Sequence, residues 1–165
     1  MRKWFARLFA VIALAGAGTG IYVAITSVHS KHDVTTSEAQ DAMAQINDAN
    51  TDLASRLGAL RKGSSPHGAQ ESVRTGAALT RKLDGDVSTR GNLGVGVHAV
   101  LKAELTYLDA VGSTLNNPRS PLRGRLNQFA VVLRQALQQV PGGQSRLVSG
   151  ASNLVVYSKL RTGGA

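Results

Sequence analysis

Residues 35–60 read TTSEAQDAMAQINDANTDLASRLGAL, and they combine a helix-start signal with a regular apolar seam. Thr35 and Glu38 match the capping box, in which the side chain of each residue accepts a hydrogen bond from the backbone amide of the other. The seam then recurs in alternating steps of four and three residues, which is the heptad period of packed helices. This stretch therefore predicts a helix that buries one face against other helices. The members of the seam are Ala39, Met43, Ile46, Asn50, Leu53, Leu57 and Leu60.

Asn50 is the polar member of this seam, and it admits two interpretations. A buried Asn in a heptad seam fixes the register of a coiled coil and favours a dimer, which makes Asn50 a candidate dimer contact. In the alternative interpretation, Asn50 forms a hydrogen bond inside a bundle made by a single chain. The seam alone does not decide between the two.

Four more apolar seams follow between turn signals, in residues 65–87, 97–115, 120–140 and 147–160. Two of them begin with a Ser-Pro pair, which suits the N-cap and the first position of a helix. Two end at Asn-Asn-Pro or Pro-Gly-Gly, which break a helix. No segment alternates with period two for long enough to be a strand. We therefore predict an all-α fold, an antiparallel helical bundle of four to five helices over residues 38–161.

The number of helices depends on the glycine-rich region 90–97. Gly91, Gly94 and Gly96 each cost helix stability, roughly 1 kcal/mol relative to Ala. Either the helix breaks near Gly91, or the glycines allow another part of the chain to approach closely. The sequence leaves both possibilities open.

The core should be built from aliphatic side chains, because aromatic residues are scarce beyond the N-terminal segment. Leu, Val, Ile and Ala suit packed helices better than a β-sandwich. We expect Leu101, Leu105 and Leu133 among the most buried side chains, because each lies in the middle of a helix and within a seam.

Upstream, residues 8–28 carry no charged side chain and are long enough to cross the hydrocarbon core of a bilayer as a helix. Arg2, Lys3 and Arg7 precede this segment, and the positive-inside rule keeps such a basic end in the cytoplasm. The expected organisation is a cytoplasmic N-terminus, a transmembrane anchor, a linker, an extracytoplasmic bundle and a frayed tail. These parts correspond to residues 1–7, 8–28, 29–37, 38–161 and 162–165.

The same N-terminal segment has an alternative interpretation as a signal peptide. Ala15, Gly16 and Ala17 have the small-x-small form that a signal peptidase accepts. Cleavage would give a secreted protein, whereas an uncleaved segment gives a single-pass protein of the cell membrane. Gly16 and Gly20 also form a G-x-x-x-G pattern that lets two membrane helices approach closely, so both are candidate contacts of a homodimer.

The chain carries a net charge of +9, and no acidic residue follows Asp109. A basic surface in this last third of the chain suits an anionic lipid or a cell-wall polymer. It equally describes a solvated face of helices that lie beside the acidic first helix. The outward orientation of the domain argues against nucleic acid as a partner. The candidate contacts with an anionic surface are Arg119, Arg123, Arg125 and Arg134.

The sequence offers little evidence of catalytic chemistry. It has no cysteine, which excludes thiol catalysis and cysteine-ligated zinc. Glu104 and Asp109 are not spaced to share one face of a helix, so they give no support for paired acid–base catalysis. The glycine-rich region follows no strand, as a nucleotide-binding loop would require. We expect no catalytic, cofactor-binding or metal-binding residue, and no enzymatic activity.

In layout, a single span followed by a heptad-bearing helix resembles the small bitopic proteins of bacterial envelope complexes. It also resembles the helical sensing domains of receptor kinases and chemoreceptors. We therefore expect a non-catalytic interaction or scaffold protein with a partner protein in the cell envelope. The alternative is a ligand-sensing module that works with a separate signalling protein. A filled core with an exposed apolar groove would favour the first function, and a polar cavity inside the bundle would favour the second.

Overall fold

The computed structural model describes residues 33–144 and 150–163, and every regular element in these ranges is helical. The all-α fold that the sequence predicts is confirmed for this part of the chain. Five α-helices and one short 3-10 helix follow one another. They are α1 Thr36–Leu60, α2 His67–Asp86, α3 Gly91–Asn116, η1 Pro121–Arg125, α4 Leu126–Gln138 and α5 Gly150–Arg161.

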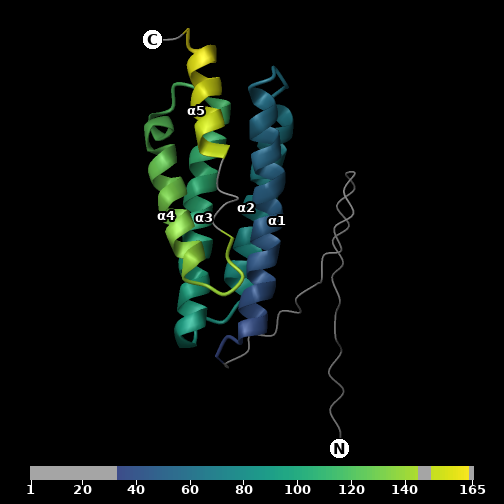
Figure 1. Ribbon diagram of the computed structural model, residues 1–165, viewed down its shortest axis with the longest axis vertical. Helices are drawn as coiled ribbons and strands as arrows, with labels where there is room; N and C mark the ends of the chain where they lie inside the picture. The colour runs from purple at the N-terminus through teal and green to yellow at the C-terminus, as the bar shows by residue number, and fades with distance from the viewer. Residues whose placement is uncertain (1–32, 145–149, 164–165) are drawn as a thin grey trace, which may run out of the picture.

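Successive helices run in alternating directions, so that α1, α2, α3 and α4 each pack beside the next (Figure 1). The last helix, α5, packs mainly against α1 and so closes the bundle. In Figure 1, α5 occupies the upper half of the space between α4 and α1, while the loop that follows α4 crosses the lower half. The apolar faces of all five α-helices meet in one core.

The start of α1 follows the capping signal in the sequence. The backbone amide of Glu38 donates to the Thr35 hydroxyl at 3.2 Å, and the backbone amide of Thr35 donates to the Glu38 carboxylate at 2.8 Å. These bonds satisfy amides that the first turn of a helix would otherwise leave unpaired. All seven seam residues of this helix are at most 4% exposed, which confirms the predicted buried face.

The glycine-rich region contains both a break and a close contact. α2 ends at Asp86, and α3 begins at Gly91, whose φ of +71° lies in the left-handed region that favours glycine. Three residues further on, a Cβ on Gly94 would lie only 2.6 Å from the Ser88 carbonyl oxygen. The glycines therefore end one helix and let the next begin tightly against the connecting loop.

Two of the three leucines expected in the core are confirmed, and one is wrong. Leu101 and Leu133 are fully buried, but Leu105 is only half-buried. The buried seam of α3 passes instead through Glu104, which is 1% exposed. Heptad steps of four and three from Val97 lead to this glutamate. The predicted seam placed the apolar Leu105 at this position instead, and its phase was therefore wrong by one residue.

Among the described helices, none is both long and apolar enough to span a bilayer. The predicted anchor at residues 8–28 lies outside the described residues, and so do Gly16 and Gly20. The described bundle ends with α5 at Arg161, close to the expected start of the tail.

Candidate functional site

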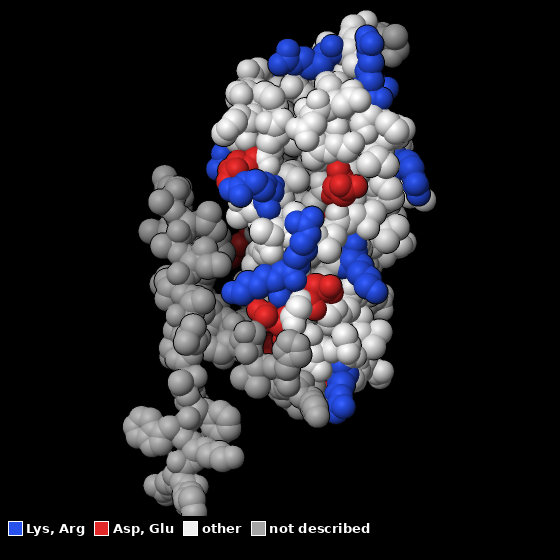
Figure 2. All heavy atoms as spheres, turned by 180° about the vertical axis from the view of Figure 1, so that it is seen from behind, with Lys and Arg blue, Asp and Glu red and all other residues white. Residues whose placement is uncertain are grey.

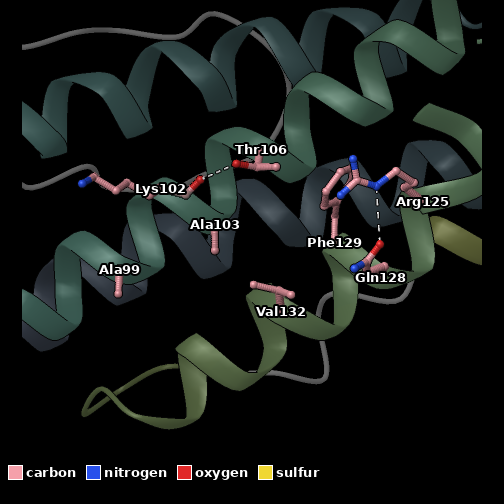
Figure 3. A pocket seen from close by; sticks show the side chains of 8 residues that line it. All are labelled: Ala99, Lys102, Ala103, Thr106, Arg125, Gln128, Phe129 and Val132. Carbon is pink, nitrogen blue, oxygen red and sulfur yellow. Dashed lines mark hydrogen bonds between the residues drawn. The ribbon is translucent and has the colours of Figure 1, made fainter. Parts of the chain in front are cut away.

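An open groove of about 470 Å³ runs between α3 and α4 on the surface of the bundle (Figure 3). Its floor is apolar, and polar or charged side chains stand around it. α3 contributes side chains from four positions, and η1 with α4 contributes the other four. The lining residues are Ala99, Lys102, Ala103, Thr106, Arg125, Gln128, Phe129 and Val132.

The groove exists because α3 presents small side chains where it faces α4. Ala99 and Ala103 are four residues apart and lie on the same face of the helix. On the opposite wall, Phe129 is half-buried and Val132 is 48% exposed. Large apolar side chains on one wall therefore face small ones on the other, and apolar surface stays in contact with water. Covering such surface is favourable by about 25 cal/mol per Å².

Arg125 is held at the rim of the groove by two contacts within its own segment. Its guanidinium carbon lies 4.8 Å from the centre of the Phe129 ring, and its Nε donates to the Gln128 side-chain oxygen at 3.4 Å (Figure 3). Lys102 supplies a second cation on the α3 side. None of the described lining residues is acidic, so the rim is positively charged and would attract an anionic group.

A second polar site lies inside the bundle and is closed to solvent. Glu104 accepts a hydrogen bond from the Asn50 side-chain amide at 3.1 Å, and this bond links α3 to α1. Burial raises the pKa of Glu104 to about 7, although the hydrogen bond from Asn50 acts in the opposite direction. Tyr107 is also buried, and burial together with the nearby Glu104 raises its pKa above the ordinary value, against a lowering by Arg134. This cluster can hold a proton near neutral pH, but a substrate has no access to it.

The structure places Asn50 in the interior, where it already has a partner in the same chain. Its amide is therefore not exposed for contact with a second copy, and its environment corresponds to the internal hydrogen bond that was the alternative interpretation. A single polar residue in a heptad seam is compatible with a dimer contact and with a hydrogen bond inside one chain. Here Asn50 forms its hydrogen bond with Glu104 of α3.

The four candidate arginines for an anionic surface do not form one cluster. Arg119, Arg123 and Arg125 lie in or beside η1, at one end of the bundle. The Arg123 guanidinium also donates to the Pro118 carbonyl oxygen at 3.3 Å. Arg134 lies nine residues beyond Arg125 on the following helix, about 13 Å along its axis.

Sequence reasoning missed Asn47, which secures the loop after α4. Its side-chain amide donates to the Gly142 carbonyl oxygen at 2.9 Å, and its side-chain oxygen accepts from the Gln144 amide at 3.3 Å. Asn47 follows Ile46 but is not a seam position, so periodicity gave no signal for it. The long separation along the chain means that local patterns could not reveal this contact.

Comparison of the chain with protein-family models, with curated proteins and with solved structures finds no match.

Proposed function

We propose that this chain is a membrane-anchored interaction module of the cell envelope, which binds a helix of a partner protein in the groove between α3 and α4. The observation that carries this proposal is the open apolar floor of the groove beside a buried, largely aliphatic core. Exposed apolar surface in a concave site is typical of protein interaction sites.

The occupant that best fits the groove is an amphipathic helix with acidic residues beside its apolar face. A helix laid along a groove inserts a row of apolar side chains at spacings of three and four residues. Small Ala99 and Ala103 leave room for such a row, and Phe129 and Val132 provide its opposing wall. Lys102 and Arg125 at the rim would attract carboxylates, which would orient the helix and speed its association.

The location of the module is part of the same proposal. Residues 8–28 form the anchor, and the three bases before them keep the N-terminus in the cytoplasm. The helical bundle is then displayed outside the cytoplasm, where the groove meets another envelope protein. A homodimer through Gly16 and Gly20 would present two such grooves on neighbouring bundles.

A non-catalytic role is the simpler account of the ionisable groups. Glu104 has the pKa that general acid–base chemistry would require, but its side chain is sealed between helices. The alternative function is a ligand-sensing module. The buried cluster of Glu104, Asn50 and Tyr107 would support it only if the helices separate and admit a ligand to the core.

Site-specific photo-cross-linking in intact membranes tests the proposed groove. A photoreactive amino acid at Val132 should cross-link to an amphipathic, acidic helix of one partner, which peptide mass spectrometry would identify. The matched control is the same substitution at Val131, which is 45% exposed on the same helix but does not line the groove. Ala103→Glu should abolish the product from position 132, because the longer side chain fills the groove.

Three results would overturn the proposal. The first is the absence of any product from position 132. The second is an equal product from both positions, which would indicate contact without use of the groove. The third is a cross-linked segment that is not an amphipathic helix.

A further inference from the structure

A group of basic residues gathers at the end of the bundle where the C-terminus lies. Helices that alternate in direction bring the α1–α2 turn, the α3–η1 connection and the end of α5 to this one end (Figure 1). In Figure 2, lysine and arginine side chains stand among uncharged residues at this end, and no acidic side chain is visible there on this face. We call it the basic end, and it consists of Arg61, Lys62, Arg119, Arg123, Arg125, Lys159 and Arg161.

Several of these cations have no counter-charge within the described part of the chain. The side chains of Lys62, Arg119 and Lys159 are exposed and form no hydrogen bond or ion pair with a described residue. Among the acids nearest this end along the helices, Asp52 pairs with Arg56 and Glu71 pairs with Arg74. Asp109 on α3 is exposed, and it is one acid against the seven bases of this end. The basic end therefore keeps a net positive field that an external anion can neutralise.

Helix dipoles explain only part of this arrangement. Lys159 and Arg161 lie in the last turn of α5, where a cation stabilises the negative end of the helix dipole. Lys62 and Arg119, by contrast, lie beyond the ends of α1 and α3, in connecting segments. The opposite end of the bundle mixes acids such as Asp84 with bases such as Arg81, so a general excess of basic residues does not account for the asymmetry.

We propose that the basic end binds a linear polyanion with phosphodiester charges repeated along its chain, as in an anionic polymer of the cell envelope. The cations come from three separate connections and are spread across the width of the bundle, on the order of 20 Å. One small anion would contact only a few of them, whereas a polymer can contact them in series. Binding would be driven by the release of counterions and would weaken steeply with salt.

The choice of a polymer over a lipid surface rests on the proposed anchor. Residues 8–28 precede α1, which begins at the opposite end of the bundle and is about 37 Å long. With the bundle upright on its anchor, the basic end points away from that membrane. Leu160 is 71% exposed between Lys159 and Arg161. Such an apolar side chain between two bases could also insert into the surface of an anionic bilayer, and vesicles are therefore tested beside the polymer.

The test uses the full chain in nanodiscs of phosphatidylcholine, with fluorescently labelled poly(glycerol phosphate) as the probe. Anisotropy titrations at several salt concentrations give the dissociation constant and its salt dependence. Lys62→Gln with Arg119→Gln should weaken binding about tenfold, because two exposed ion pairs are lost. The slope of log K against log salt should fall by about 2, one for each lost phosphate contact.

The matched control removes two charges from the opposite end through Arg81→Gln with Lys82→Gln, and its affinity should change by less than about twofold. Equal losses in both double variants would overturn the proposal, because non-specific charge would then explain binding. Absence of salt-sensitive binding to the polymer would also overturn it. Vesicles that contain phosphatidylglycerol should not bind better than the polymer, and a reversed preference would assign the basic end to lipid. Neither double variant touches the groove residues, so cross-linking at Val132 reports on the partner helix independently.

Discussion

Replacing Glu104 with Gln should stabilise the bundle at neutral and alkaline pH. Among the described residues, Glu104 is the acidic or basic group that the fold buries most completely, at 1% exposed. Asn50, Tyr107 and Arg134 are polar groups that influence this cluster. Gln has nearly the same shape, its side-chain oxygen can still accept the hydrogen bond from Asn50, and it cannot ionise. The substitution therefore isolates the free energy of placing a negative charge in the core.

The magnitude follows from the difference between the two pKa values. The carboxyl group has a pKa of 4.5 when it is exposed in the unfolded chain and about 7 when it is buried in the folded one. Because folding raises the pKa of Glu104, the protonated carboxyl group contributes its full stability below about pH 4.5, and this stability is lost as the pH rises to about 7. Above about pH 7 the free energy of unfolding stays lower by a constant amount of about 3 kcal/mol.

Urea unfolding of the full chain in a neutral detergent, followed by circular dichroism between pH 4 and pH 8, measures this effect. The free energy of unfolding of Glu104→Gln minus that of the natural chain should increase by about 3 kcal/mol between these two pH values. Thr106→Ser, at an exposed position of the same helix, changes no ionisable group and is the control, so its difference should stay constant. A constant difference for Glu104→Gln as well would refute the argument that the buried carboxyl titrates with a raised pKa.

Five further substitutions test the packing of the bundle. Asn47→Ala should lower the free energy of unfolding by about 1–3 kcal/mol and speed amide exchange in residues 142–144, because both side-chain bonds to the loop are lost; unchanged exchange there would contradict the contact. Gly94→Ala should destabilise the protein because the added Cβ has no room beside the Ser88 carbonyl oxygen. Gly85→Ala has open space around it and should stabilise α2 by about 0.5–1 kcal/mol. Equal melting temperatures for the two variants would refute the close contact at Gly94. Leu133→Ala should cost about 2–5 kcal/mol in urea unfolding, and the half-buried Leu105 should cost clearly less when replaced by Ala; equal losses would mean that the seam of α3 is still wrongly phased.

The sequence predicted α1 well because the signals that define this helix are local. The capping residues and the seam lie within one stretch, and the step of four and three residues translates directly into one buried face. The same rule predicts a buried position at Glu104, since heptad steps of four and three from Val97 reach this residue. The neighbouring Leu105 was assigned to the core instead because it is apolar. A buried carboxyl group is tolerated here because burial favours its protonated form and Asn50 donates a hydrogen bond to it.

The groove could not be predicted in this way, because it depends on how two helices sit against each other. The sequence shows small residues at Ala99 and Ala103 and large ones at Phe129 and Val132, but it does not show that these pairs face each other across α3 and α4. The contact of Asn47 with the loop after α4 is likewise set by tertiary packing. Local patterns therefore determine which face of each helix is buried, whereas the candidate site arises from contacts between distant parts of the chain.

The most direct test of the proposed function is the affinity of the full chain for the partner helix identified by cross-linking. Isothermal titration calorimetry would compare the natural chain with Val132→Glu and Val131→Glu, which place the same charged side chain at neighbouring, similarly exposed positions. We predict that Val132→Glu weakens binding at least tenfold, because a carboxylate would be desolvated against the apolar floor of the groove, and that Val131→Glu changes it by less than about twofold. Equal affinities of the two variants would contradict the claim that this protein binds its partner in the groove between α3 and α4.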